Sequence, residues 1–272
     1  MSEEDATNST QAYRRRGSAY AVDRGAGPAV LLAHGTLMDR TMFAPQVSAL
    51  SDAYRVVAYN LRARTDRYRE SYDLDDLADD CAALMDHLGI ERAVLGGMSM
   101  GGFMGLRFAL RYPERLSGLV LIDSIADPHT PEEQETYEEM IAGLRDAPAV
   151  PSRLAETVSH LLFGRTTHEE RPDLVAEWVE RWQTYPPASV VGEVESWLYR
   201  EGVADRLGEI DVPVLVVHGE EDAALDVERA EPMLDALPDA RLARIPAAGH
   251  SSNLERPAAV NEAVRTFLDD VA

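Results

Sequence analysis

The sequence predicts an α/β protein with a mostly parallel, doubly wound sheet and an inserted helical cap. Short apolar runs alternate with amphipathic helical segments along most of the chain, as in sheets that carry helices on both faces. One stretch, residues 128–208, has helical patterns but no strand-like run. A length of 272 residues and a hydrophobic content of 45% suit one large globular domain with an insertion.

The strands of this sheet are expected at apolar runs of about five or six residues. Their continuous apolar character is typical of strands that are buried on both faces of a parallel sheet. The runs cover residues 29–33, 55–59, 93–96, 118–122, 212–217 and 240–245.

The clearest helix precedes the run at residues 93–96. Apolar side chains recur there at spacings of three and four, which places them on one face of a helix that covers the sheet. They are Leu74, Leu77, Cys81, Leu84 and Leu88. Gly89 follows as the expected C-terminal stop.

The chain is expected to divide into a core and a cap. Residues 1–12 show no periodicity and are predicted to be a disordered tail. Residues 13–127 and 209–272 carry the alternation of strands and helices and form the α/β core. Residues 128–208 leave the sheet after one strand and return before another, so they are predicted to form a helical cap over the sheet edge.

Acidic residues dominate the charge. Forty-eight Asp and Glu oppose 26 basic residues, all of them Arg, for a net charge of −22. Such a field repels nucleic acid and anionic membranes, so neither is expected as a partner. Two explanations stand side by side: a GC-rich genome that replaces Lys codons with Arg codons, and a high-salt cytoplasm in which cations screen the carboxylates.

Several other classes of protein are excluded by composition. No apolar run approaches the roughly 20 residues that cross a bilayer, and the first residues are acidic and polar, unlike a secretory signal. We therefore expect a cytoplasmic protein. Cys81 is the only cysteine, which excludes an internal disulfide. There is no phosphate-binding glycine loop and no metal-ligand spacing, so no cofactor and no metal are expected.

The strongest functional motif is the Gly-x-Ser-x-Gly pattern of Gly97, Ser99 and Gly101. It follows the apolar run at 93–96 and precedes a helical segment at 103–110, which is the context of a nucleophile elbow. A serine in this sharp turn has strained dihedral angles, and the glycines let the two backbones pass closely. The turn also places Ser99 at a helix N-terminus, which favours developing negative charge. Ser99 is the predicted nucleophile.

From about residue 18 onward the chain resembles the α/β-hydrolase superfamily. The resemblance is to its capped subgroup of esterases, lactonases and cofactor-free haloperoxidase-like enzymes. The Met-Ser-Met-Gly-Gly sequence at the elbow, and the Asn-Leu-Glu-Arg-Pro sequence after His250-Ser251-Ser252, are also similar to 3-oxoadipate enol-lactonases. An aspartate nucleophile is absent from the elbow, which excludes haloalkane dehalogenases and epoxide hydrolases.

The base expected for Ser99 is His250, one of seven histidines. It lies on a loop after the last predicted strand, which matches the catalytic position of the family, and Gly249 lets that loop bend toward the strand ends. The alternative is an ordinary surface-loop histidine. The other histidines are placed on a polar helix face, in the cap or at strand ends: His87, His129, His160, His168, His34 and His218.

The third member of the triad is expected to be Asp222, which would hold the imidazole tautomer. It follows the strand at 212–217, and the order Ser99, Asp222, His250 is the order of the hydrolase pattern. Asp123 ends another strand, at a position that some relatives use instead. The neighbouring Glu220 and Glu221 leave the choice of acid open.

Acyl transfer also needs N–H donors for the oxyanion. The backbone N–H of Met100, directly after the nucleophile, is one candidate. The loop after the strand at 29–33 reads His34-Gly35-Thr36-Leu37-Met38 and resembles the His-Gly-x motif of the family. It offers Thr36 as the second donor, with Leu37 as the alternative, and it gives His34 a structural role.

Two further features concern the loops and the pocket. Relatives usually carry Asp-x-Arg-Gly-x-Gly where this chain has Asn-Leu-Arg-Ala-Arg-Thr at 60–65, so the glycine turn is lost. Five methionines near the elbow and the oxyanion loop suggest a soft apolar lining, although Met98 and Met104 are more simply core residues. Trp178, Trp182 and Trp197 lie in the cap, as its own core or as part of a substrate box.

These observations together predict a serine hydrolase that cleaves a small, largely apolar ester or lactone through an acyl-enzyme. Acyl transfer, C–C bond hydrolysis and perhydrolysis use the same triad and are alternatives. A non-catalytic binding module on the same fold is a further alternative, which a complete triad disfavours.

Overall fold

A seven-stranded sheet forms the centre of the computed structural model, which describes residues 20–271. Its strand order is β1-β3-β2-β4-β5-β6-β7, and all neighbours are parallel except the antiparallel pair β1 and β3. The strands are β1 Ala21–Arg24, β2 Ala29–Ala33, β3 Arg55–Tyr59, β4 Ala93–Met98, β5 Leu116–Ile122, β6 Val214–Gly219 and β7 Ala240–Ile245. The predicted fold class is thus confirmed, and the predicted tail of residues 1–12 lies outside the described residues.

The two edge strands of the sheet, β1 and β7, differ from what the sequence predicted. Strand β1 was not predicted, because its sequence Ala-Val-Asp-Arg contains no apolar run and half of it is exposed. Strand β7 was expected to be apolar on both faces, but most of it is only half-buried and Arg241 and Arg244 lie on it. Both strands have a neighbour on one side only, so their outer positions face solvent and tolerate charged side chains.

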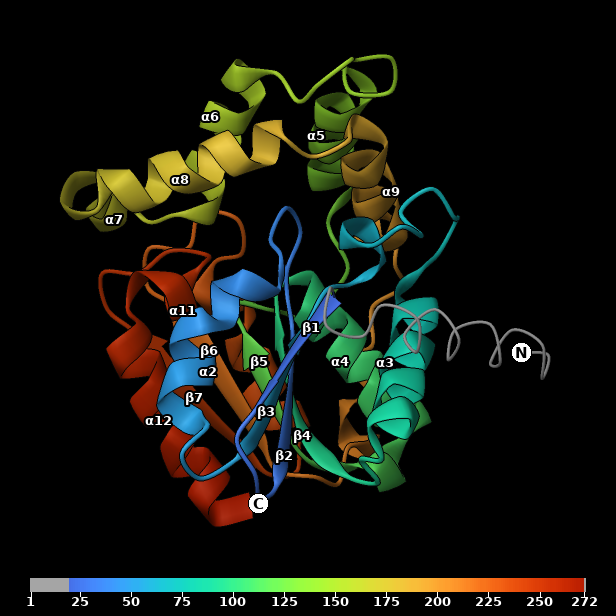
Figure 1. Cartoon of the computed structure of the whole chain (residues 1–272), viewed down its shortest axis with the longest axis vertical. Coiled ribbons are helices and arrows are strands. Elements are labelled where there is room, and N and C mark those ends of the chain that lie inside the picture. Colours follow the sequence, from blue (N-terminus) through green and yellow to red (C-terminus); the bar gives the residue numbers. More distant parts are fainter. Residues whose placement is uncertain (1–19, 272) are drawn as a thin grey trace.

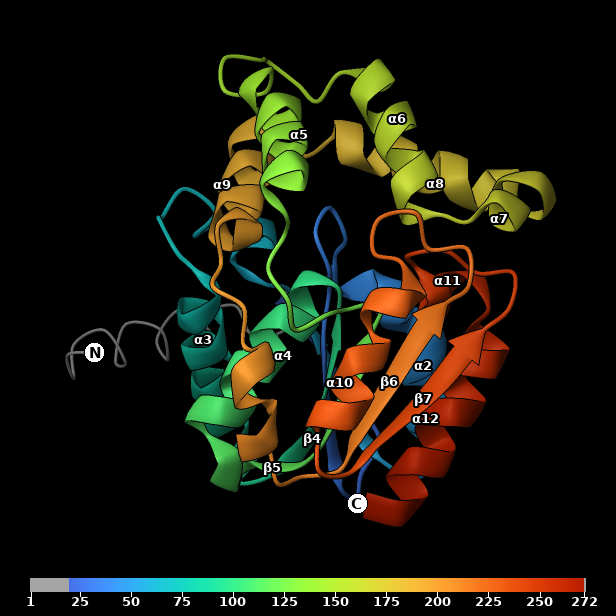
Figure 2. The same cartoon turned by 180° about the vertical axis from the view of Figure 1, so that it is seen from behind.

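Helices cover both faces of the sheet (Figures 1 and 2). Helices α2 (Ala44–Leu50) and α12 (Pro257–Val271) pack together on one face, and α3 (Leu74–Leu88) and α4 (Met100–Arg111) pack together on the other. Helix α10 (Glu231–Ala236) packs against β7, and the short α11 (Ser252–Glu255) leads into α12. This is the doubly wound arrangement that the alternating sequence pattern indicated.

The boundaries of helix α3 are determined by its local sequence. It begins after Asp73, whose side chain accepts a hydrogen bond from the backbone of Asp76 while the Asp76 side chain accepts one from the backbone of Asp73. It ends at Gly89, which has a φ of 65°. The predicted apolar face and the predicted glycine stop are both confirmed, because a capping box and a left-handed glycine depend only on neighbouring residues.

Between β5 and β6 the described chain forms helices and no strand. These are α5 Pro131–Ala142, α6 Ser152–Leu162, α7 Arg165–Glu170, α8 Pro172–Gln183 and α9 Pro187–Leu198, followed by a 3-10 helix at Ala204–Glu209. Figures 1 and 2 show α5 to α9 beyond the edge at which the parallel strands end. We refer to α5 to α9 as the roof.

The roof has two halves. Helices α5 and α9 pack together, and α6, α7 and α8 form the second group. Within residues 20–271, no helix combines the length and the apolar character needed to cross a membrane.

Candidate active site

Ser99 lies in the turn between β4 and α4, where the nucleophile elbow was predicted. Its backbone has a φ of 50° and a ψ of −114°, a strained conformation for a residue with a side chain. A Cβ on Gly97 would collide with the backbone of Gly101, and a Cβ on Gly101 would collide with that of Ala33. The two glycines therefore permit the close approach of strand and helix that presents Ser99 at the sheet edge.

His250 lies beside Ser99, on the loop between β7 and α11. Its Nε2 is 2.9 Å from the Ser99 Oγ. The loop is braced by Glu255, a buried residue whose Oε1 accepts hydrogen bonds from the backbone N–H groups of Gly249 and Ser251, at 3.0 Å each. Since these two residues flank His250, Glu255 sets the position from which the imidazole reaches Ser99.

Asp222 completes a hydrogen-bonded chain from the other side. Its Oδ2 is 2.7 Å from His250 Nδ1, and its Oδ1 accepts from the backbone N–H groups of Ala224 and Leu225. Burial alone would raise the pKa of Asp222, but His250 and His218 outweigh it and lower that pKa to about 2. Burial likewise opposes protonation of His250, and the Asp222 carboxylate outweighs it and raises the pKa of His250.

Asp123, the alternative acid, has a different set of partners. Its Oδ1 accepts from the Gly219 N–H, and its Oδ2 accepts from the N–H and the hydroxyl of Ser252. Burial raises the pKa of Asp123 to about 6. Asp123 thus joins the end of β6 to the start of α11, while the hydrogen bond to His250 comes from Asp222. Glu221 bonds Thr166 in the roof instead.

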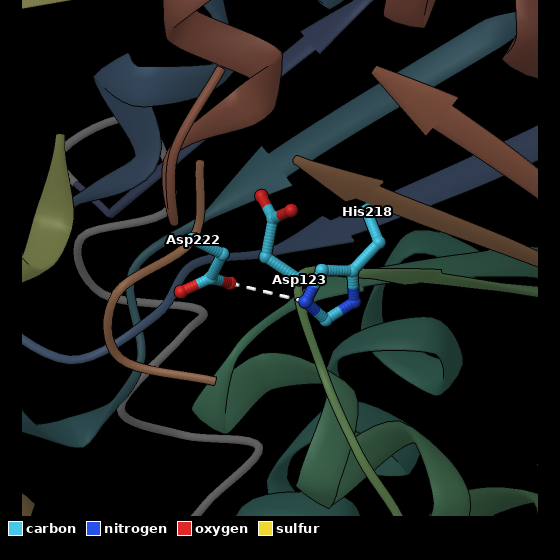
Figure 3. Close-up of side chains that lie close together, drawn as sticks. All are labelled: Asp123, His218 and Asp222. Atoms are coloured by element: carbon cyan, nitrogen blue, oxygen red, sulfur yellow. Dashed lines mark ion pairs between the residues drawn. The ribbon is translucent and has the colours of Figure 1, made fainter. Parts of the chain in front are cut away.

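Asp123, His218 and Asp222 offer ligand atoms that lie within 4.8 Å of one another, which is close enough for a metal ion (Figure 3). Most of their polar atoms have partners, and within the described residues the buried His218 Nδ1 is the exception. His218 Nε2 lies 2.7 Å from the Leu225 carbonyl oxygen and 3.1 Å from Asp222 Oδ2, so that nitrogen carries the proton and donates. A protonated nitrogen cannot coordinate a metal. Through Nε2, His218 helps to hold Asp222 in place.

The oxyanion loop between β2 and the next 3-10 helix faces the elbow. Within residues 20–271, the backbone N–H groups of Thr36 and Met100 have no hydrogen-bond acceptor. The N–H of Leu37, the alternative donor, is engaged at 3.0 Å by Glu193 Oε2 from α9. His34 links two loops, with Nδ1 donating to the Gly35 carbonyl oxygen at 2.8 Å and Nε2 accepting from the Leu61 N–H at 3.0 Å.

The altered loop at 60–65 has a defined shape without its glycines. Arg62 to Arg64 form a 3-10 turn, and Arg62 pairs with the buried Asp80. Arg64 reaches Glu193 in the roof at 2.7 Å and lies over the ring of Tyr185. A loop that differs from the family pattern therefore connects the core to α9.

The cavity above Ser99 and His250 is mostly apolar, and the roof supplies most of its lining. Met38, Met42 and Met100, which were expected to line it, are fully buried in the core, and so are Met98 and Met104, for which the core was the preferred interpretation. Met140 from α5 lines the cavity instead. The elbow turns the neighbouring side chains into the sheet, so proximity in sequence did not mean exposure. Trp182 and Trp197 line the cavity, whereas Trp178 packs inside the roof.

Three residues important to this site were not predicted as site residues, although Glu255 belongs to the Asn-Leu-Glu-Arg-Pro sequence noted above. Glu193 and Glu255 are buried acidic residues on helices, and His129 lies in the loop before α5 and lines the cavity. Each has at least one partner far away in the sequence. The signal available was the presence of acidic side chains at apolar positions of α9 and α11, which indicates a buried partner.

These features define the class of protein. The chain belongs to the α/β hydrolase fold family, whose family model matches residues 28–257, and it is a hydrolase. It is 31% identical over 250 residues to "Putative carbamate hydrolase RutD" of Caulobacter sp. strain K31, covering 89% of this chain and 91% of that one.

Solved structures agree with this assignment. A thermophilic esterase from Thermogutta terrifontis has a TM-score of 0.87 at 33% identity, over 92% of this chain and 93% of that one. The enol-lactonase from Burkholderia xenovorans LB400 has a TM-score of 0.84 at 27% identity, over 92% of this chain and 96% of that one.

Proposed function

We propose that this hydrolase cleaves a small, largely apolar carboxylic ester or lactone through an acyl-enzyme on Ser99. The observation that carries the proposal is the continuous chain of hydrogen bonds from Ser99 Oγ through His250 to Asp222, at the floor of an apolar cavity. Nucleophile, base and orienting acid within hydrogen-bond reach are the signature of nucleophilic acyl transfer.

The reaction proceeds in two halves. His250 Nε2 takes the proton of Ser99 Oγ as that oxygen attacks the carbonyl carbon, and it then protonates the leaving alcohol oxygen as the ester C–O bond breaks. In the second half a water molecule gives its proton to His250 and attacks the acyl carbon. His250 then gives that proton to Ser99 Oγ as the acyl–oxygen bond breaks, which releases the acid and restores Ser99. In a lactone both products are parts of one molecule.

The N–H groups of Thr36 and Met100 hold the oxyanion in both halves. Neither donates to a protein acceptor within the described residues, so both are available to an oxygen that becomes negative. The Leu37 N–H is engaged by Glu193, and this favours Thr36 over Leu37. Removing one such donor in comparable sites costs about 10²–10³ in kcat.

Asp222 keeps the proton of the imidazole on Nδ1 and stabilises the imidazolium that forms. Because its pKa is lowered to about 2, Asp222 remains a carboxylate throughout the cycle. Every group in this scheme belongs to the chain, and the scheme uses no metal or cofactor.

Carbamate hydrolysis is a second candidate, favoured by the similarity to the protein named as a carbamate hydrolase. The same attack on a carbonyl carbon would occur, but the leaving group or the acyl group would carry nitrogen. The apolar lining of the cavity favours the ester, since it offers few partners for a carbamate N–H.

A panel of p-nitrophenyl esters, lactones and carbamates tests the proposal. We expect turnover of short esters or lactones, a trapped acyl group on Ser99 in mass spectra, and labelling of Ser99 by a fluorophosphonate. Ser99→Ala should abolish all three, while Ser152→Ala, at an exposed roof position, should change none of them. An acyl group on another residue, or turnover that survives Ser99→Ala, would refute the proposal.

A further inference from the structure

The chain enters the roof and leaves it at the same place. Arg200, which follows α9 on the returning segment, binds the outgoing segment there. Its Nη2 donates to the Asp127 carbonyl oxygen at 2.6 Å on the outgoing segment. Its Nη1 donates to His129 Nδ1 at 2.5 Å. Arg200 is buried and lies over the ring of Phe103, and within residues 20–271 no carboxylate forms an ion pair with it.

This contact determines where the imidazole of His129 carries its proton. An arginine can only donate hydrogen bonds, so Nδ1 of His129 accepts and Nε2 holds the N–H. Burial, followed by the charge of Arg200, lowers the pKa of His129 to about 3, so the ring stays neutral at ordinary pH. His129 is therefore a neutral donor with a fixed tautomer.

The ring is also held in place by packing. Its centroid lies 4.9 Å from that of Trp197, 5.2 Å from that of Tyr137 and 6.1 Å from that of Phe103. Only 4% of the residue is exposed. A donor whose rotation is prevented on all sides is suited to selecting the position of an acceptor, because little entropy is lost when the hydrogen bond forms.

His129 lines the same cavity as Ser99 and His250. Within the described residues Nε2 has no hydrogen-bond partner, and no Asp or Glu lines the cavity. The buried indole N–H of Trp197 also lacks an acceptor. A donor that lines a substrate cavity and has no protein acceptor is available to a ligand.

We propose that His129 is a specificity-determining residue, and that the preferred ester or lactone carries a second acceptor oxygen, a ketone or a carboxylate, that binds its Nε2–H. This inference rests on the proposed function and names the substrate class within it. The uncompensated guanidinium behind the ring polarises the N–H and adds a positive potential. The remaining apolar surface holds the hydrocarbon between the scissile carbonyl and the second oxygen.

A matched series of methyl esters tests the proposal without any mutation. Methyl hexanoate is the parent, and its oxo derivatives move a ketone one carbon at a time away from the ester. Monomethyl adipate supplies the carboxylate arm. We expect the kcat/KM of one member to exceed that of the parent by about 10-fold, the size of one well-placed hydrogen bond. The best member tells whether a ketone or a carboxylate is preferred.

Three variants then assign the preference to His129. His129→Phe keeps an aromatic ring and removes the donor, so the preference for the oxygenated member over methyl hexanoate should disappear. His129→Gln keeps an acceptor for Arg200 and a donor for the cavity, and should retain part of the preference. His160→Phe changes an exposed roof histidine away from the cavity and should leave the preference intact.

The outcomes separate this proposal from the proposed function. Turnover of methyl hexanoate with no gain for any oxygenated member overturns the role of His129 and leaves the serine hydrolase in place. A preference that persists in His129→Phe overturns it as well. No turnover in either series, with Ser99 unlabelled by a fluorophosphonate, overturns the proposed function and this inference with it.

Discussion

The floor and the roof of the cavity are built on different principles. The floor presents Ser99, His250 and Asp222 from loops at strand ends, with a strained φ at Ser99 and backbone donors that fix Asp222. The roof presents apolar side chains from helices, and the loop that leads into it presents a rigid donor at His129. The floor therefore depends on backbone geometry that few sequences allow. The roof depends on side chains that can be substituted by others. We infer that the chemistry belongs to the floor and the choice of substrate to the roof.

The two regions are nevertheless joined at two buried carboxylates. Glu255 braces the His250 loop and also accepts from the Gly164 N–H and the Thr167 hydroxyl in the roof. Glu193 in the roof accepts from the oxyanion loop. A change in the roof can therefore alter the positions of groups in the floor through these contacts.

The largest effect is expected from the nucleophile and the base. Ser99→Ala and His250→Ala should each lower kcat by roughly 10³ to 10⁶, because either loss removes the same proton transfer and attack. The double variant should be little worse than either single one, as steady-state kinetics with a p-nitrophenyl ester would show. Losses that multiply would mean that the two residues act separately.

The next largest difference is expected between variants of the two aspartates of the floor, Asp222 and Asp123. Asp222→Asn should lower kcat by about 10² to 10⁴, since the wrong imidazole tautomer is then favoured. Asp123→Asn places an amide N–H against backbone donors, so it should lower the free energy of unfolding by about 1–3 kcal/mol and leave kcat within about tenfold. Kinetics and urea unfolding of both variants measure this, and the reverse order would assign the acid to Asp123.

The pH dependence of kcat/KM reports the coupling between Asp222 and His250. Only neutral His250 can accept the Ser99 proton, so activity should be lost as the pH falls through the His250 pKa. Asp222 raises that pKa above the ordinary value of 6.5. The acid limb should therefore lie above 6.5, and in Asp222→Asn it should move to lower pH. A limb that does not move would contradict the coupling between Asp222 and His250.

Within the roof, Trp197→Ala should change the preference among acyl chain lengths by about tenfold, because it enlarges the cavity by a large apolar side chain. Labelling of Ser99 should persist. Trp178→Ala is the matched control: it removes a buried roof tryptophan that does not line the cavity, so it should lower stability without changing the preference. An equal change in both variants would mean that the roof acts through its folding alone.

The smallest effect is expected from the salt concentration, which acts on the charges of the whole surface. With a net charge of −22, self-repulsion weakens as the Debye length falls from about 30 Å at 0.01 M to about 3 Å at 1 M salt. We expect Tm to rise by a few degrees from about 0.05 M to 3 M KCl. A gain that continues above about 1 M would support adaptation to a salt-rich cytoplasm, and a plateau below about 0.3 M would indicate ordinary screening.

Local patterns predicted the central strands, helix α3 and the turn at Ser99 because each depends on residues that are neighbours in the chain. Strand β1 was missed because an edge strand needs only one partner and can do without an apolar run. The methionine lining was wrong because the direction of each side chain follows from how the elbow packs.

The sequence by itself determined the α/β architecture and the positions of Ser99, Asp222 and His250 after β4, β6 and β7, since period, turn glycines and chain order are properties of local sequence. Tertiary structure alone decided which groups meet. Glu193 engages Leu37 across 156 positions, and Arg200 holds His129 across 71. These buried polar contacts follow no periodicity, because desolvation makes each side chain take whichever partner the folded chain brings to it.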